Sequence, residues 1–170
     1  MNKFDINYSE EIISDIKEKI SRFNWNKLPD FNNWSLGINK EVLRDICNYW
    51  VSKYNWRKEQ EKLNSLNHFT ADINDLNIHY VYEKGKSSNA IPLLISHGWP
   101  GSFLEFNKII GPLTNPKKYG LDDSICFDLI MPSIPGFVFS SAPKYPYGPR
   151  KIASYYDKLM TKVLNYKSYY

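Results

Sequence analysis

The stretch that decides the fold spans residues 91–106 and reads IPLLISHGWPGSFLEF. Its first five residues form an unbroken apolar run, which is typical of a strand covered on both faces in a parallel sheet. Residues 102–105, SFLE, match a capping box, in which Ser102 accepts from the amide three residues on and Glu105 reaches back. The stretch therefore predicts a buried strand, a turn and a helix that stops at Gly111-Pro112.

The predicted turn between this strand and this helix is His97-Gly98-Trp99-Pro100-Gly101. Glycine there lets the backbone bend sharply and approach a ligand. The amides of the turn lie near a helix N-terminus, where negative charge is favoured. A merely structural turn is the more common interpretation of an isolated H-G-x-P motif, but the position between a buried strand and a capped helix favours a functional one.

The chain after this stretch continues to alternate between strand and helix. Residues 127–131, FDLIM, form a second apolar strand that Pro132 closes. The clearest helical pattern follows, and its apolar positions are Ile152, Tyr155, Tyr156, Leu159, Met160, Val163 and Leu164. Residues 167–170 can begin a further strand. Doubly buried strands that alternate with helices predict an α/β fold with right-handed crossovers.

The first 66 residues are interpreted as helices and connecting loop. Ser9 and Asn39 are suited to cap two helices. Apolar residues recur at helical spacing after each cap: Ile12, Ile13, Ile16, Ile20 and Phe23, then Val42, Leu43, Ile46, Tyr49 and Trp50. A third helix is predicted over residues 56–66, and the charges of residues 56–63 are interpreted as a solvated face. Alternation over residues 69–82 then predicts a β-hairpin that turns at Asn74-Asp75.

Composition narrows the class of protein. The chain has 170 residues, 42% hydrophobic and 24% charged, so a single globular domain is expected. The net charge is +4 and the basic residues are scattered, which argues against nucleic-acid binding. No apolar signal segment and no stretch long enough to cross a membrane is found, so a cytoplasmic protein is expected. Cys47 and Cys126 are expected to be buried free thiols.

Five segments carry a resemblance to a known family. They are Trp34-Ser35-Leu36-Gly37, Tyr49-Trp50, YNWRKEQEKLN at 54–64, HGWPGSFLEF at 97–106 and PSIPGF at 132–137. Together they resemble the microsomal-type epoxide hydrolases, a group that includes the juvenile hormone epoxide hydrolases of insects. The helical N-terminal segment distinguishes this family from other α/β-hydrolases, because those share only the H-G-x-P turn.

The resemblance implies an incomplete α/β-hydrolase fold. Residues 1–110 would form the epoxide hydrolase N-terminal region, with a helical meander over residues 1–66 followed by the hairpin and the strand–turn–helix. Residues 111–170 would continue the α/β-hydrolase core and end before the nucleophile elbow.

The resemblance also implies a reaction. A carboxylate on the nucleophile elbow attacks an epoxide carbon and forms an ester, while two lid tyrosines donate hydrogen bonds to the epoxide oxygen. A histidine paired with an acidic residue activates the water that hydrolyses the ester to a vicinal diol. Neither a metal ion nor an organic cofactor is required. The nucleophile, the lid tyrosines, the acid and the base are all expected beyond Tyr170, so no catalytic nucleophile, acid or base is assigned within the chain.

One active-site element is matched within the chain. In α/β-hydrolases the loop after the third strand donates one oxyanion-hole N–H, and the resemblance assigns this donor to the backbone of Trp99. His97, Gly98 and Pro100 would shape the turn, and the bond before Pro100 is expected to be cis. Val138 departs from the family, which usually has glycine there. A β-branched residue is strained at positive φ, so the loop either bends differently or has drifted in sequence.

Other candidate residues have simpler interpretations. His97 could be taken for a catalytic base, but no acidic partner can be assigned, which favours a role in holding the turn. His68 and His79 lack metal-ligand spacing and are interpreted as surface or strand residues. Asp128 lies within a strand without an elbow signature and is not nominated as a nucleophile. The aromatic residues interpreted as packing residues are Trp25, Trp34, Trp50, Trp56, Tyr155 and Tyr156.

Two functions of different classes follow. The first is the N-terminal portion of an epoxide hydrolase, with a role in detoxification or aromatic hydrocarbon catabolism. Alone it would be inactive, and poorly soluble because an apolar strand lies at an open sheet edge. Its partners would be an epoxide in the complete enzyme, and a C-terminal hydrolase half or further copies of itself. The second function is a non-catalytic interaction module that binds a partner hydrolase. The helical N-terminus argues against a third, a dehalogenase.

Overall fold

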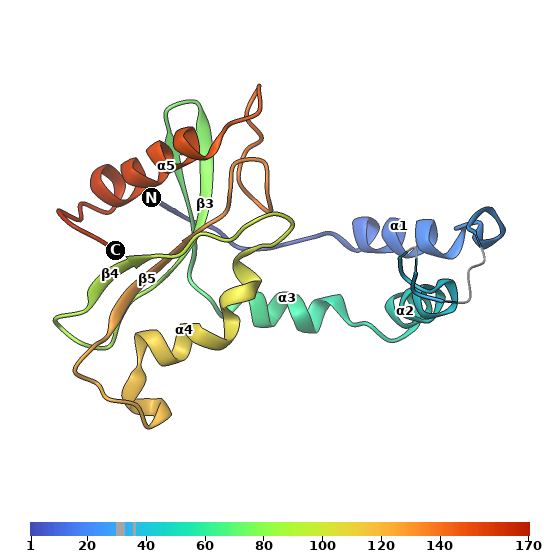
Figure 1. Cartoon of the computed structure of the whole chain (residues 1–170), viewed down its shortest axis with the longest axis horizontal. Coiled ribbons are helices and arrows are strands. Elements are labelled where there is room, and N and C mark those ends of the chain that lie inside the picture. Colours follow the sequence, from blue (N-terminus) through green and yellow to red (C-terminus); the bar gives the residue numbers. More distant parts are fainter. Residues whose placement is uncertain (30–32, 36) are drawn as a thin grey trace. The chain divides into compact units, whose positions relative to one another are not determined.

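The structure is a computed structural model that describes residues 1–29, 33–35 and 37–170. The chain divides into two compact units, Ile6–Leu63 and a second unit made of Met1–Asp5 together with Asn64–Tyr170. Their α-helices and the strands β3, β4 and β5 are labelled in Figure 1.

The first unit is helical, as predicted. It contains α1 (Glu10–Ser21), a short 3-10 turn η1 (Trp25–Lys27), α2 (Lys40–Ser52) and most of α3 (Trp56–Asn64). Both predicted caps are confirmed. The Ser9 hydroxyl accepts from the Ile12 amide at 3.3 Å, and the Asn39 side chain accepts from the Glu41 amide at 2.9 Å. Each bond satisfies one of the amides that a helix start leaves unpaired.

The apolar stripes of this unit are only partly covered. Neither α1 nor α2 contains a buried residue, and Ile46 and Trp50 are about half exposed. The interpretation of Trp34 as a packing residue is wrong, because it is 62% exposed. Leu36, which belongs to the same motif, lies outside the described residues.

The second unit is built on a mixed sheet with the strand order β1-β2-β3-β5-β4. The strands are β1 (Asn2–Lys3), β2 (His68–Ile73), β3 (Leu76–Glu83), β4 (Ile91–Leu94) and β5 (Phe127–Pro132). The hairpin β2–β3 is confirmed, and Asn74 turns it with a φ of 53°. The pairing of β4 with β5 is parallel, as the apolar runs predicted. The pair β1–β2 was missed, because two residues are too few to show alternation.

Helices cover the sheet on both sides. Figure 1 shows α4 (Asn107–Thr114) and α5 (Pro149–Lys158) on opposite faces. The helix α5 continues as a π-helical turn η4 (Leu159–Val163), so the predicted long helix is confirmed. The core on the α5 side contains Ala71, Ile73, Leu76, Ile78, Tyr80, Ile130, Tyr155, Leu159 and Met160. Tyr155 is therefore a core residue, as predicted.

The helix after the glycine turn differs from the prediction at both ends. It begins as a 3-10 turn η2 (Phe103–Phe106), in which Ser102 accepts from the Leu104 amide, two residues on instead of three. Its α-helical part runs through Gly111-Pro112 to Thr114. The prediction that proline ends this helix is wrong, because the Thr114 hydroxyl donates to the Ile110 carbonyl and the Asn115 amide to the Gly111 carbonyl.

Both cysteines are free thiols, as predicted. Cys126 is buried and donates its S–H to the Thr114 carbonyl at 3.1 Å. Cys47 lies on α2 and is only partly buried, so the expectation of two buried thiols holds for Cys126 alone.

The strand β4 lies at the edge of the sheet and is only partly buried. Its outer side pairs with the last residue of the chain. The Tyr170 amide donates to the Pro92 carbonyl at 3.0 Å, and the Leu94 amide donates to the Tyr170 carbonyl at 2.8 Å. These two bonds place Tyr170 opposite Leu93 in a parallel register, so Tyr170 pairs with β4 as a residue of an adjacent parallel strand would.

Tyr80 leads to a stability prediction. Its side chain is fully buried, and its hydroxyl has no hydrogen-bond partner among the described residues. We expect Tyr80→Phe to raise the free energy of unfolding by about 1 kcal/mol, because it removes a desolvated, unpaired hydroxyl. The matched variant Tyr155→Phe should lower it, because the Tyr155 hydroxyl donates to Asp75. Urea denaturation of both variants checks this, and a destabilised Tyr80→Phe would contradict it.

Candidate functional site

The glycine turn lies at the carboxyl end of β4. His97 is buried, whereas the Trp99 side chain is 83% exposed. The Trp99–Pro100 peptide bond is cis, as expected. Among the hydrogen bonds found in the described part of the chain, none uses the Trp99 amide. This N–H is therefore available to donate to a ligand.

His97 uses both ring nitrogens to hold the turn. The Ile134 amide donates to its Nε2 at 3.1 Å, so Nε2 must carry a lone pair. The proton then resides on Nδ1, which donates to the Gly98 carbonyl at 3.1 Å. The Gly101 amide donates to the same carbonyl at 2.7 Å. This arrangement leaves neither nitrogen for general-base work.

The loop after β5 passes beside His97. Gly136 and Val138 have φ values of 86° and 52°, both in the left-handed region. The alternatives for Val138 are therefore resolved in one respect: the backbone takes the conformation that suits glycine, although the residue is valine. Val138 is 44% exposed, so packing does not explain the choice.

Val138 should be replaceable by glycine with a gain in stability. A non-glycine residue in the left-handed region is strained by about 1–2 kcal/mol. We expect Val138→Gly to recover about 1 kcal/mol, partly offset by the greater freedom of glycine in the unfolded chain. Thermal unfolding measures this. Asn165→Gly is the control, because asparagine tolerates its φ of 59° and should gain less.

Two histidines form a buried pair that the sequence did not reveal. His68 and His79 lie on β2 and β3 as predicted, but a surface location is wrong, because both are buried. His68 Nδ1 and His79 Nε2 are 3.0 Å apart, and His79 Nδ1 is 2.8 Å from the Ser133 hydroxyl. Burial, and secondarily the nearby His68, lower the pKa of His79 from its ordinary value of 6.5 to about 3. His79 is therefore neutral at physiological pH.

The Asp128 carboxylate is held by hydrogen bonds from neighbouring groups. One carboxylate oxygen accepts from the Gly85 amide at 2.9 Å and the other from the Tyr166 hydroxyl at 2.7 Å. Tyr82 and Tyr166 hydroxyls are 2.8 Å apart. Burial, with the hydrogen bonds to Tyr82 and Asp128, raises the pKa of Tyr166. This geometry fixes the carboxylate in a structural network, in line with the decision not to nominate it as a nucleophile.

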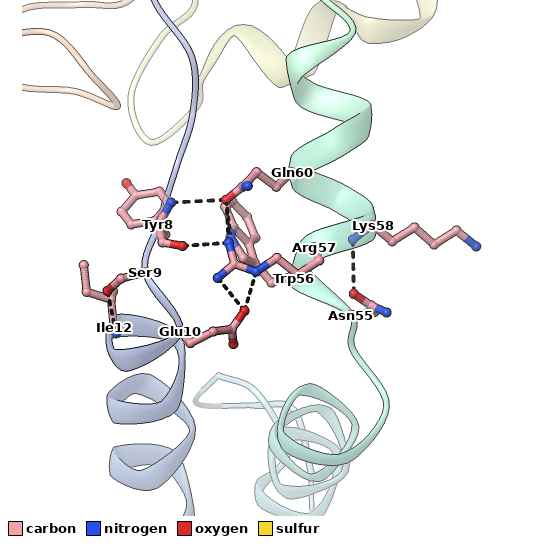
Figure 2. A network of polar contacts seen from close by, with 9 residues as sticks. All are labelled: Tyr8, Ser9, Glu10, Ile12, Asn55, Trp56, Arg57, Lys58 and Gln60. Atoms are coloured by element: carbon pink, nitrogen blue, oxygen red, sulfur yellow. Dashed lines mark hydrogen bonds and ion pairs between the residues drawn. The ribbon is translucent and has the colours of Figure 1, made fainter.

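In the helical unit, a polar network joins the start of α1 to α3, as Figure 2 shows. The Arg57 guanidinium donates to the Tyr8 carbonyl at 2.7 Å and forms an ion pair with Glu10. The Gln60 side-chain oxygen accepts from the Tyr8 amide at 3.2 Å and from the Trp56 indole at 3.0 Å. Among the charges interpreted as a solvated face, Arg57 is therefore held in a polar network, although its side chain remains partly exposed.

An apolar pocket of about 440 Å³ lies beside this network within the same unit. It is lined by Tyr8, Ile13, Ile16, Lys17, Ile46, Tyr49, Trp50, Tyr54 and Trp56. Apart from Lys17, these are residues of the predicted helical stripes together with their aromatic neighbours. Lys17 is the only charged residue in this lining.

Among residues 1–29, 33–35 and 37–170, no group of three or more histidine, cysteine, aspartate or glutamate side chains could hold a metal ion. Over the same residues, no helix has both the length and the apolar character needed to cross a membrane.

A partly parallel sheet flanked by helices, with a glycine turn leading from a strand into a helix, is a feature of the α/β-hydrolase class. Within that class, the family model described as "Epoxide hydrolase N terminus" matches residues 1–106. The chain belongs to the epoxide hydrolase family, and these residues are its N-terminal domain.

Known relatives are similar along nearly the whole chain. The chain is 37% identical to juvenile hormone epoxide hydrolase 2 of Ctenocephalides felis, over 100% of the chain and 37% of that protein. It is 38% identical to epoxide hydrolase 1 of Sus scrofa, over 98% of the chain and 38% of that protein. The chain therefore spans less than two fifths of the length of these relatives.

Solved structures of epoxide hydrolases are also similar to the chain over nearly its whole length. The juvenile hormone epoxide hydrolase of the silkworm Bombyx mori superimposes with a TM-score of 0.87 at 32% identity, covering 99% of the chain and 40% of that structure. The Aspergillus niger epoxide hydrolase gives 0.82 at 30% identity, covering 95% and 43%. These similarities confirm the predicted family and the α/β-hydrolase fold.

Proposed function

We propose that these residues form the N-terminal part of an enzyme that adds water to an epoxide and yields a vicinal diol. The observation that carries the proposal is the unpaired amide of Trp99 at the carboxyl end of β4. A carboxylate would attack an epoxide carbon, the C–O bond would break, and the epoxide oxygen would take a proton from a lid tyrosine. Activated water would then add to the resulting ester carbonyl, whose oxygen becomes negative and accepts from the Trp99 amide. Collapse of this intermediate would break the ester C–O bond, release the diol and restore the carboxylate.

The pairing of Tyr170 supports this geometry. Tyr170 lies opposite Leu93 in a parallel register, so a strand continued from Tyr170 would run in the same direction as β4. Adjacent parallel strands end at the same edge of a sheet, and ligands bind outside that edge in open α/β sheets. A nucleophile a few residues beyond Tyr170 would therefore arrive beside the Trp99 turn.

The 170 residues alone would not catalyse the reaction. Residues 1–110 would supply the N-terminal region and residues 111–170 the first part of the core, with Trp99 as the one active-site donor and His97, Gly98 and Pro100 as the turn that presents it. An oxyanion donor without a nucleophile and a base gives little acceleration, because residues of such a site act as a unit.

The test compares two polypeptides. The first is the 170-residue chain alone, and the second is the same chain joined to the part of Sus scrofa epoxide hydrolase 1 that follows the matched region. With styrene oxide as a simple epoxide, we expect diol from the joined chain and none above background from the chain alone. Robust diol formation by the chain alone would contradict its inactivity, and an inactive but folded joined chain would contradict the assigned donor role.

A second candidate function is an interaction module that binds a partner hydrolase. The observation that favours it is the uncovered apolar face of the helical unit, where neither α1 nor α2 has a buried residue. Faces of this kind generally mark sites of interaction. Co-purification of the folded, monodisperse chain with an intact hydrolase would favour this function, whereas an Ile46→Glu variant that binds equally well would argue against it.

A further inference from the structure

We propose that Ser140 is a positioning residue for the Trp99 amide, acting through a one-directional chain of hydrogen bonds that begins at His79 and ends at the glycine turn. The proposal rests on the proposed function, in which the Trp99 amide donates to the oxyanion. Nothing in the sequence motifs assigned a role to Ser140, which lies in the loop after β5.

The first step runs from β3 to this loop. The Ser140 hydroxyl is buried, accepts from the His79 amide at 3.0 Å and lies 2.8 Å from the Ser133 carbonyl. A hydroxyl has one hydrogen to donate, and the carbonyl can only accept. The direction is therefore fixed: the His79 N–H donates to Ser140, and the Ser140 O–H donates to Ser133.

The second step passes through a peptide group. The Ser133 carbonyl and the Ile134 N–H belong to the same planar trans peptide unit, so they point in opposite directions. By holding the carbonyl oxygen, Ser140 aims the Ile134 N–H the other way, where it donates to His97 Nε2 at 3.1 Å. The Ser133 amide also donates to the His79 carbonyl at 2.8 Å, which anchors the loop to β3.

The third step repeats the same geometry at the turn. Because Nε2 of His97 accepts, its Nδ1 carries the proton and donates to the Gly98 carbonyl at 3.1 Å. The Gly98 carbonyl and the Trp99 N–H again share one planar peptide unit. The bond from His97, together with that from the Gly101 amide, therefore sets the direction of the Trp99 N–H. The exposed Trp99 indole does little to hold the turn.

All the hydrogen bonds in this series run in the same direction, from His79 toward Trp99. Each acceptor group donates onward, and such chains polarise their members, so that the last donor becomes stronger than an isolated one. The last donor is the Trp99 N–H. This series of hydrogen bonds therefore both sets the direction of the Trp99 N–H and makes it a stronger donor to an oxyanion.

The test uses nuclear magnetic resonance on the 15N-labelled 170-residue chain. The hydrogen bond between the Ile134 amide and His97 Nε2 joins two nitrogens, so it transmits a scalar coupling between them. We expect this coupling in the unsubstituted chain, with His97 as a single tautomer protonated on Nδ1. Ser140→Ala should lose the coupling, allow His97 to exchange between its two tautomers and shift the Trp99 amide resonance.

Two variants separate positioning from general stability. Ser140→Thr keeps the hydroxyl and should retain the coupling. Ser141→Ala removes the neighbouring hydroxyl, which accepts from the Asn77 amide outside the chain of bonds, and should also retain it. If Ser140→Ala does not fold, Ser140→Cys replaces it, because a thiol of nearly the same shape is a weak donor. Unchanged coupling and an unchanged Trp99 amide in the folded variant would overturn the proposal.

A kinetic arm uses the joined chain. Ser140→Ala should slow hydrolysis of the ester about tenfold, less than complete loss of the donor, and leave ester formation unchanged. Ser141→Ala should change neither rate. Absence of turnover in every joined chain, including the unsubstituted one, would count against the proposed function, whereas the coupling experiment would still decide whether the chain of hydrogen bonds exists.

Discussion

Replacing Trp99 by proline in the joined chain should slow the hydrolysis of the covalent ester by about 10²–10³-fold, because proline has no N–H to donate to the oxyanion. Ester formation should be largely unaffected, since the oxyanion develops only in the second half of the reaction. The ester would therefore accumulate, and mass spectrometry of the intact protein during turnover would detect the added mass of the substrate.

The control is Trp99→Ala, which removes the exposed indole and keeps the amide. We expect it to retain most of the ester hydrolysis rate. If Trp99→Ala loses as much as Trp99→Pro, the indole and not the amide is the important group. Circular dichroism of both variants should match the unsubstituted chain, because the indole is 83% exposed and buries little area.

Acid should destabilise the second unit at a pH well above that at which carboxylates protonate. The pKa of His79 is about 3 in the folded chain and near 6.5 when unfolded, so between these values the unfolded state binds more protons. Stability contributed by the neutral, buried His79 is complete above pH 6.5 and is lost as the pH falls. We expect a decrease of about 1.4 kcal/mol in the free energy of unfolding for each pH unit below 6.5. Urea denaturation at pH 7.0, 6.0 and 5.0 measures it.

The variant His79→Gln isolates this effect, because glutamine is polar but does not titrate. Its lower stability should vary less with pH over the same range. Asp75 could also contribute to a pH dependence of stability, because the hydrogen bond from Tyr155, the largest of several causes, lowers its pKa. Its contribution is lost only below about pH 4, outside the measured range. An equally steep pH dependence in His79→Gln would show that another group is responsible.

Local sequence signals were sufficient where neighbouring residues decide the structure. The caps at Ser9 and Asn39, the hairpin turn at Asn74 and the strand β4 each depend on a few adjacent residues and were predicted correctly. The predicted burial of β4 on both faces was wrong, because β4 is only partly buried at the edge of the sheet. The signal failed at Pro112, where the helix continues because its terminal carbonyls find donors downstream. It also failed at Trp34, whose exposure depends on what surrounds it.

The candidate site was predicted only in part, because only some of its residues are neighbours in the sequence. The turn at residues 97–101 is continuous in sequence, so a motif was enough to select it. His79, Ser133 and Ser140 are separated by up to 61 positions and meet only after β3 and β5 pair. A buried location for His79 requires cover on both faces of the sheet, and the alternation pattern of one strand does not report this.

The sequence by itself determined the family, the order of the longer strands and helices, and the glycine turn, because each shows in patterns of residues close together along the chain. Only the tertiary structure decided the tautomer of His97, the low pKa of His79 and the direction of the Trp99 N–H. These depend on hydrogen bonds and burial that arise when distant segments pack, and no local pattern encodes which nitrogen, carbonyl or hydroxyl will face which.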